Sequence, residues 1–167
     1  MKGKTCTRRV FLSSPSWKED FNWFLQNYTK ALAEENHHHP LLAWRKIDPS
    51  RIEELRFSLE TLLAQTEEAC LLLAEWEGIQ IGYFLGLLKT CLAEDPSRIG
   101  YLNGLYVSPE FRQKGVGKSL YQEGLAWFKS RGLNAIELYL AEGNSMGLKF
   151  WEKQGYAVAE KILVKRI

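Results

Sequence analysis

Residues 107–120, VSPEFRQKGVGKSL, join an apolar run typical of a strand, Ile99 to Val107, to an amphipathic run that ends at Gly132. Gly115 and Gly117 lack a Cβ, so the backbone can turn tightly here and point several N–H groups at one place. The unpaired donors and the positive end of the helix dipole attract an anion. This turn therefore predicts a site for a phosphate or a pyrophosphate.

The runs on either side of this turn predict a mixed α/β sheet. Ala135 to Ala141 is a further strand, and it should run parallel to the strand at 99–107 because a helix lies between them. Ala69 to Trp76 and Ile79 to Cys91 predict two antiparallel strands, joined through a tight turn at Glu77-Gly78.

The two ends of the chain complete the pattern. Thr5 to Leu12 predicts a first strand, and a capping box of Ser16 and Glu19 predicts a helix that reaches Glu35. Asp48-Pro49 opens a second helix. Asn144 to Gln154 predicts a short helix, and Tyr156 to Ile167 one or two closing strands. The expected order is β-α-α-β-β-β-α-β-α-β, in one domain over residues 1–167 with helices on both faces of the sheet.

Composition supports a globular domain and excludes several classes of protein. The chain has 167 residues, of which 46% are hydrophobic, and its net charge of +2 is too small for binding nucleic acid by bulk charge. No apolar run approaches the ~20 residues of a membrane span, and no signal sequence is expected. The three cysteines, Cys6, Cys70 and Cys91, are far apart, which predicts packed free thiols and a cytoplasmic protein. Adjacent histidines at 37–39 lack the spacing of a metal site, so no metal is expected.

Two common phosphate-binding motifs do not fit the turn. A P-loop needs glycine at position 112, which is Arg112. A dinucleotide loop needs glycine at position 120, which is Leu120, and an acidic residue at the end of a following strand. Nucleotide hydrolysis and dinucleotide binding are therefore disfavoured.

A third motif, [RQ]xxGx[GA], is met by residues 112–117, RQKGVG, which resemble the acetyl-coenzyme A loop of the GNAT superfamily of N-acetyltransferases. Residues 105–111 and 144–156 also resemble segments of that family, and the similarity extends over nearly the whole chain from Thr5. The resemblance implies a mixed, mostly antiparallel sheet with a central parallel pair of strands that splay apart.

The resemblance also implies how acetyl-coenzyme A (acetyl-CoA) binds. The pantetheine arm would lie between the splayed strands and the pyrophosphate on the loop amides, while the N–H of Val107 or a neighbour would polarise the thioester carbonyl. The implied contacts are Leu105, Tyr106, Val107, Arg112, Gln113, Lys114, Gly115, Val116, Gly117, Lys118, Ser119, Asn144 and Trp151.

The catalytic acid and base depart from the family pattern. Many members have a tyrosine acid where this chain has Trp151, and an indole cannot donate its proton as an acid. Members often carry a glutamate on the strand before the loop, but residues 99–107 include no carboxylate. Tyr101 and Asn103 are the candidates, because strict alternation would place them on the same side as Leu105 and Val107. The further candidates, which the sequence does not rank, are Tyr83, Tyr106, Tyr139 and Glu142. Alternatively, the coenzyme A thiolate leaves without a dedicated acid.

The acceptor is expected to be a primary amine on a small molecule or a peptide. Residues 16–68 hold ten acidic and six basic residues, a net charge of −4, and in similar proteins this segment borders the acceptor pocket. A cationic amine such as an aminoglycoside or a polyamine would suit it, although solvated helix faces explain the same charges. A catalytically silent module that binds acyl-CoA stays open as the alternative function. The sequence does not decide whether the chain forms a homodimer, which is common among similar proteins.

Overall fold

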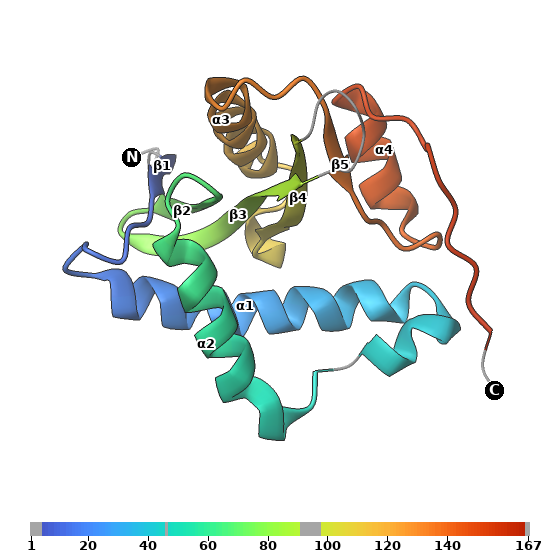
Figure 1. Cartoon of the computed structure of the whole chain (residues 1–167), viewed down its shortest axis with the longest axis horizontal. Helices are drawn as coiled ribbons and strands as arrows, with labels where there is room; N and C mark the ends of the chain where they lie inside the picture. Colours follow the sequence, from blue (N-terminus) through green and yellow to red (C-terminus); the bar gives the residue numbers. More distant parts are fainter. Residues whose placement is uncertain (1–4, 46, 91–97, 166–167) are drawn as a thin grey trace.

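The computed structural model describes residues 5–45, 47–90 and 98–165. Its strands form one sheet in the order β1-β2-β3-β4-β5, antiparallel throughout except that β4 and β5 are parallel (Figure 1). The strands are β1 (Thr5–Arg9), β2 (Ala69–Trp76), β3 (Ile79–Thr90), β4 (Arg98–Val107) and β5 (Ile136–Leu138). The predicted mixed sheet is confirmed.

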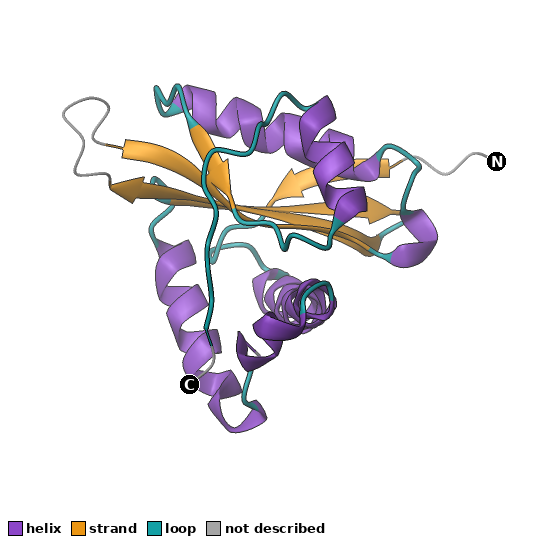
Figure 2. Cartoon of the chain, turned by 90° about the vertical axis from the view of Figure 1, so that its right-hand side faces the viewer, coloured by secondary structure: helices purple, strands orange, loops and turns teal. Residues whose placement is uncertain are grey.

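Helices cover both faces of this sheet, as Figure 2 shows with the strands seen edge-on. The helices are α1 (Trp17–His37), α2 (Ile52–Ala64), α3 (Val116–Ser130) and α4 (Ser145–Lys153), with short 3-10 helices η1 (Pro40–Arg45), η2 (Pro49–Arg51) and η3 (Pro109–Phe111). The apolar residues of α1 and α2 pack on one face, and those of α3 and α4 pack on the other. None of the described helices is both long and apolar enough to span a lipid bilayer.

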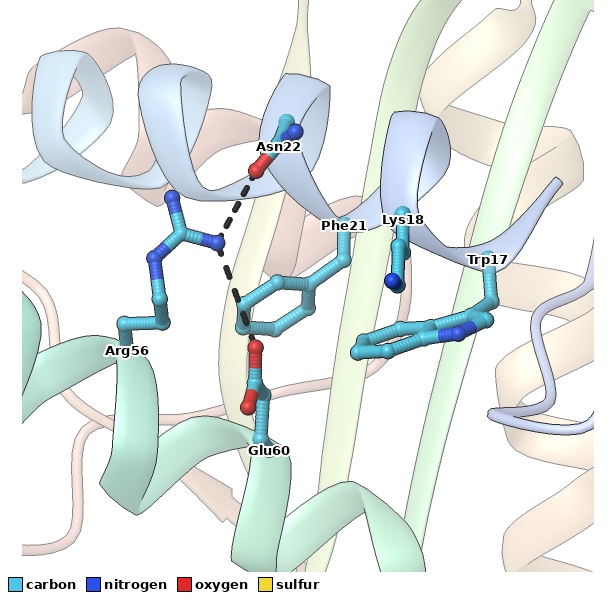
Figure 3. A pocket seen from close by; sticks show the side chains of 6 residues that line it. All are labelled: Trp17, Lys18, Phe21, Asn22, Arg56 and Glu60. Carbon is cyan, nitrogen blue, oxygen red and sulfur yellow. Dashed lines mark hydrogen bonds and ion pairs between the residues drawn. The ribbon is translucent and has the colours of Figure 1, made fainter.

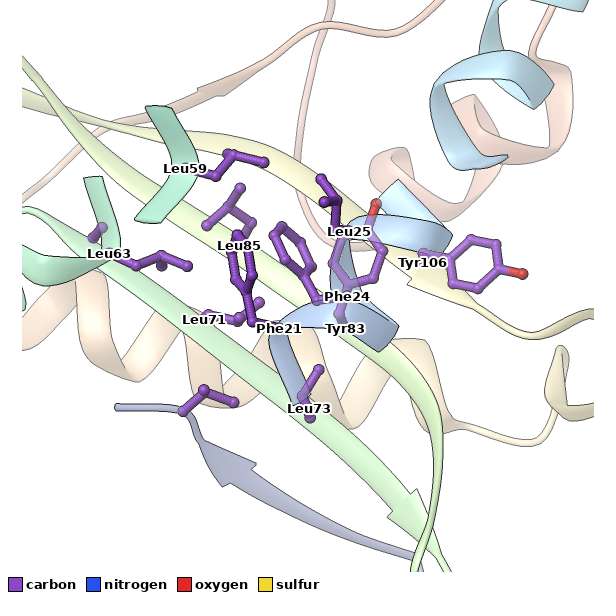
Figure 4. Packing of buried hydrophobic residues seen from close by; sticks show 12 residues of the cluster. Phe21, Phe24, Leu25, Leu59, Leu63, Leu71, Leu73, Tyr83, Leu85 and Tyr106 are labelled. Atoms are coloured by element: carbon purple, nitrogen blue, oxygen red, sulfur yellow. The ribbon is translucent and has the colours of Figure 1, made fainter. Parts of the chain in front are cut away.

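Alternation along β3 divides the core between the two faces. Tyr83 and Leu85 lie among the side chains of α1 and α2, where Tyr83 packs edge-to-face against Phe24 with ring centroids 5.0 Å apart (Figure 4). Phe84 points the other way and packs against Phe128 of α3. A Cβ at Gly124 would lie 2.2 Å from the Phe84 ring, so α3 approaches the sheet closely only because that position is glycine.

One irregularity in the ladder between β3 and β4 decides which way the β4 side chains point. Leu85 is paired with Gly104, whereas the next β3 residue, Gly86, is paired with Leu102. Asn103 is therefore an extra residue on β4, which is the definition of a β-bulge. A bulge interrupts the alternation of side chains between the two faces.

Several local predictions are confirmed. Glu77 and Gly78 have φ angles of 52° and 80°, as expected for a two-residue hairpin turn. The Asp48 carboxylate accepts a hydrogen bond from the Ser50 N–H at 2.9 Å, so it caps η2 ahead of α2.

Others are wrong. Ser16 makes no capping bond to the start of α1, because its hydroxyl donates to the Asp20 carboxylate at 2.9 Å. The first strand ends at Arg9 rather than Leu12. The predicted packed thiol at Cys6 is exposed, whereas Cys70 is buried and its pKa is raised to about 11 by burial; Cys91 lies outside the described residues.

The largest difference concerns the end of the chain. Residues 156–165 form no strand, and β5 spans only Ile136–Leu138 rather than 135–141. Three apolar side chains of residues 156–165 are exposed, namely Val158, Ile162 and Leu163, the last at 93%. Strand propensity alone does not make a strand, which also needs an edge to pair with. The parallel pair β4 and β5 thus lies at the edge of the described sheet rather than at its centre.

Candidate active site

The parallel pair separates after three paired positions. Gly100, Tyr101 and Leu102 of β4 lie opposite Ile136, Glu137 and Leu138 of β5, and β4 then continues to Val107 without a β5 partner. In the described residues the edge of β4 beyond Leu102 therefore has no paired strand, and the space beside this edge is called the gap below.

Backbone groups of β4 face this gap. The Ser108 N–H donates to the Ile81 carbonyl of β3 at 2.9 Å, and Tyr106 lies opposite Tyr83. Because hydrogen-bonding directions alternate along a strand, the N–H and C=O groups of Leu105 and Val107 point away from β3 and into the gap.

The start of α3 supplies further donors beside the same gap. Gly115 has φ 86° and forms the N-cap, and the first bond of the helix runs from the Ser119 N–H to the Gly115 carbonyl at 3.0 Å. The N–H groups of Val116, Gly117 and Lys118 therefore have no carbonyl partner within the helix. A Cβ at Gly117 would lie 3.6 Å from Val107, which places these donors next to the end of β4.

The side chain of Arg112 joins this loop to its surroundings. Its Nε donates to the Val107 carbonyl and its Nη2 to the Glu34 carboxylate of α1, both at 2.8 Å. Its guanidinium also lies 5.7 Å from the centre of the Tyr106 ring, within the range of a cation–π contact. Arg112 therefore supplies the predicted positive charge, but its hydrogen bonds connect β4 to α1. Gln113, Lys114, Lys118 and Ser119 are exposed.

Asn144 lies on the β5 side of the gap, where it caps α4. Its Oδ1 accepts from the Gly147 N–H and its Nδ2 donates to the Glu35 carboxylate, both at 2.8 Å. The other oxygen of Glu35 accepts from the Ala141 N–H. Together with the Glu34–Arg112 ion pair, these bonds connect α1 to both sides of the gap.

Sequence reasoning assigned Glu34 and Glu35 no role beyond their contribution to net charge. One signal was present. Negative charges at the C-terminal end of a helix oppose its dipole, so two adjacent glutamates there indicate partners elsewhere in the fold.

The expected orientation of Tyr101 and Asn103 is wrong, and the bulge is the reason. Asn103 faces α1, where its Oδ1 accepts from the Tyr28 hydroxyl at 3.0 Å, and Tyr101 lies on the same face of the sheet. Leu105 and Val107 pack instead on the α3 face. The extra residue in β4 thus separates the side chains of Tyr101 and Asn103 from those of Leu105 and Val107.

Burial affects the tyrosines on the α1 face. Burial raises the pKa of Tyr28. It also raises the pKa of Tyr101, and the electrostatic interaction with the nearby Tyr139 raises that pKa further. The pKa of Tyr83, which is 1% exposed, is raised well above its ordinary value for the same reason. These phenols therefore stay protonated at neutral pH and can donate hydrogen bonds.

The remaining predicted residues are placed as follows. Trp151 is buried and packs edge-to-face against Tyr121 and Tyr156, at centroid distances of 5.6 and 5.4 Å, so its contact with a ligand stays a prediction. Tyr139 and Glu142 are exposed. No group of three metal-binding side chains occurs within the described ranges.

Comparison with known proteins identifies the family. Residues 16–156 match the family described as Acetyltransferase (GNAT). This chain belongs to the GNAT acetyltransferase family. The mycothiol acetyltransferase of Thermobispora bispora is 30% identical to this chain over 109 residues, which are 62% of this chain and 37% of that protein. The chain thus spans little more than a third of that relative's length.

Solved GNAT structures share the fold. The GCN5-related N-acetyltransferase from Ralstonia eutropha matches with a TM-score of 0.75 and 20% identity, over 98% of this chain and 99% of that one. Aminoglycoside N-acetyltransferase AAC(6')-Iy in complex with CoA matches with a TM-score of 0.70 and 17% identity, over 100% and 97%.

Proposed function

We propose that this chain transfers the acetyl group of acetyl-CoA to a primary amine. The observation that carries the proposal is the opening between β4 and β5, where the backbone groups of Leu105 and Val107 face the gap next to the free N–H groups that begin α3. A strand edge and a helix N-terminus in one place suit a ligand that has both amides and a pyrophosphate.

The chemistry of these backbone groups suits each part of that ligand. The N–H groups of Val116, Gly117 and Lys118 would hold the pyrophosphate, and the edge of β4 at Leu105 and Val107 would pair with the pantetheine amides. Acetyl-CoA supplies the activated acetyl group. The Val107 N–H is our candidate for the donor that polarises the thioester carbonyl, a role that a fixed backbone dipole performs well.

Polar side chains on the α1 face would orient the amine. Tyr101 is protonated at neutral pH because burial raises its pKa, so it suits a hydrogen-bond donor better than a general base. Asn103 lies where β4 leaves β5 and is fixed by Tyr28. A thiolate whose thiol pKa is near 8.5 leaves without a dedicated acid, so positioning and carbonyl polarisation would supply most of the rate.

We further propose that the acceptor is a cationic amine. The excess of acidic residues in 16–68 supports this idea. Several of these carboxylates already have arginine partners, including Asp20 with Arg8 and Glu34 with Arg112. The charge argument therefore supports the class of acceptor without selecting one compound.

Amine-dependent release of thiol from acetyl-CoA tests the activity. We expect faster release with polyamines and aminoglycosides than with an amine that carries no further positive charge, and equal release at low salt would remove support for a cationic acceptor. Binding of CoA is measured in parallel. Binding without release from any amine would indicate the silent acyl-CoA module, and failure to bind would contradict both readings.

A pair of glycines on α3 tests the location. Gly115 and Gly132 flank this helix with φ angles of 86° and 72°, and a Cβ at either would meet nothing within 4 Å. Gly115→Ala and Gly132→Ala should therefore cost similar stability, about 1 kcal/mol. Only Gly115→Ala should raise KM for acetyl-CoA, and equal KM values for the two variants would argue against this loop as the site.

A further inference from the structure

Two carboxylates at the end of α1 connect the acidic segment 16–68 to the gap. All ten acidic residues of this segment lie in the described part of the chain. Among them, only Glu34 and Glu35 hydrogen-bond to segments that border the gap. Glu34 accepts from Arg112, in the loop before α3. Glu35 accepts from Ala141 and Asn144, in the segment that leads into α4.

Other acidic side chains of this segment have partners away from the gap. Figure 3 shows Glu60 of α2 beside Arg56, whose guanidinium lies 3.9 Å from the Glu60 carboxylate and donates to Asn22 of α1 at 2.9 Å. Glu68 forms an ion pair with Arg98, the first residue of β4, which lies at the end of that strand farthest from the loop. These carboxylates are therefore poor partners for an acceptor at the gap.

Glu34 differs from Glu35 because it has an oxygen to spare. One oxygen of Glu35 accepts from Ala141 and the other from Asn144. Glu34 uses Oε2 for the Arg112 Nη2 at 2.8 Å, and its Oε1 has no hydrogen-bond partner in the described part of the chain. The Glu34 side chain is 50% exposed, so a solute can reach it. A carboxylate accepts at both oxygens, so Glu34 can bind a second cation without losing Arg112.

The surroundings of Glu34 already hold one cation. The Arg112 guanidinium lies 5.7 Å from the centre of the Tyr106 ring and donates to the Val107 carbonyl at 2.8 Å. Burial, and next the charge of Glu34, raise the pKa of Tyr106, which agrees with a carboxylate close to that ring. The face of an aromatic ring also favours positive charge. A single guanidinium separates Glu34 from Val107, whose N–H is the candidate donor to the thioester.

We propose that Glu34 binds a second positive charge of the acceptor while another amine of the same molecule receives the acetyl group. Arg112 is a positioning residue, because its two hydrogen bonds hold this carboxylate next to the end of β4. The acceptor is then a molecule with at least two ammonium groups rather than a monoamine. This inference rests on the proposed function and assigns the preference for a cationic acceptor to one side chain.

The first test compares 1,5-diaminopentane with 5-amino-1-pentanol, which has the same length but a hydroxyl group in place of one ammonium group. Release of thiol from acetyl-CoA gives kcat and KM for each amine. Glu34→Gln keeps an oxygen that accepts from Arg112 but removes the charge. It should raise KM for the diamine about two- to fivefold and leave KM for the amino alcohol and for acetyl-CoA unchanged.

Glu19→Gln is the matched control, since it removes the same charge from an exposed position of α1. It should change none of these KM values. Equal increases for both amines in Glu34→Gln would overturn the inference, and so would an equal increase for the diamine in Glu19→Gln. A wild-type enzyme that has the same KM for the diamine and the amino alcohol would overturn it as well.

A second measurement separates this inference from the proposed activity. Titration calorimetry of spermine into the complex with CoA follows acceptor binding without acetyl transfer. Glu34→Gln should weaken spermine binding about two- to fivefold and leave CoA binding unchanged, and the loss should shrink at high salt because the contact is half-exposed. Absent or unaltered spermine binding contradicts the role of Glu34. Spermine binding that depends on Glu34, without thiol release from any amine, counts against the transferase activity alone.

Discussion

The two faces of the sheet are held to their helices in different ways. On the α3 face the contact depends on shape, because glycine at position 124 leaves room for the ring of Phe84. On the α1 face, charge and hydrogen bonds add to the apolar core, with Asp20 bound to Arg8 and Glu35 bound to Asn144. Substitutions on the α3 face should therefore act sterically at any pH, whereas those at the polar contacts of α1 should depend on ionisation.

Gly124→Ala should give the largest effect. The new methyl group would overlap the Phe84 ring, and we expect the free energy of unfolding to fall by about 3 kcal/mol. Denaturant unfolding at pH 5 and pH 8 should give the same loss. Adding Phe84→Leu to this variant should recover part of it, and a loss below about 1 kcal/mol would show that the α3 face adapts more easily than its geometry indicates.

Asp20→Asn should come next, with a loss of about 2 kcal/mol at pH 7. Burial disfavours the Asp20 charge, but hydrogen bonds from Arg8, Ser16 and Gln80 outweigh it and hold the pKa of this carboxyl below its ordinary value of 3.8. A lowered pKa in the folded state means that the stabilisation is present above pH 3.8 and is lost as the pH falls through the folded pKa.

Unfolding measured from pH 7 to pH 3 checks this dependence. The difference between wild type and Asp20→Asn should be constant above about pH 5 and shrink below about pH 4. If the difference in unfolding free energy is the same at every pH, then the Asp20 contact does not depend on ionisation and resembles the steric contacts on the α3 face.

Glu35→Gln should change activity more than stability. The Glu35 carboxylate accepts from both Asn144 and the Ala141 N–H, and a single amide oxygen cannot replace both of its oxygens. We expect kcat/KM to fall about fivefold, which corresponds to about 1 kcal/mol. Glu19→Gln, an exposed carboxylate on the same helix, is the control and should leave kcat/KM unchanged.

Gly117→Ala should have the smallest effect on folding. Its Cβ would meet Val107 at 3.6 Å, an ordinary contact, so the unfolding free energy should change by less than about 0.5 kcal/mol. The same methyl group would project beside the gap and raise KM for acetyl-CoA several-fold. Gly117→Ala and Gly124→Ala thus make one substitution on one helix with opposite expected consequences, and similar stability losses would remove that distinction.

Much of this architecture follows from local pattern. The turn at 107–120 predicted the strand, the helix and the exposed N–H groups, because glycine placement and apolar periodicity are local properties. The hairpin at Glu77-Gly78 is confirmed for the same reason.

The errors concern interactions between distant residues. Ser16 bonds Asp20 because Arg8 of β1 and Gln80 of β3 gather around that carboxylate, which no local capping pattern shows. The segment at 156–165 has a strand-like sequence but no strand beside it. The side chains of Tyr101 and Asn103 are misplaced because a bulge depends on the register of a neighbouring strand.

That inserted residue, Asn103, has a consequence for comparing related chains. Upstream of it, odd-numbered β4 residues point toward α1; downstream, the even-numbered Tyr106 does so. Deleting Asn103 would restore simple alternation and leave Tyr106 on the α1 face and Leu105 and Val107 on the α3 face. An alignment with a chain that lacks the bulge therefore needs its one-residue gap here, because a gap placed at either end of the strand would compare side chains from opposite faces of the sheet.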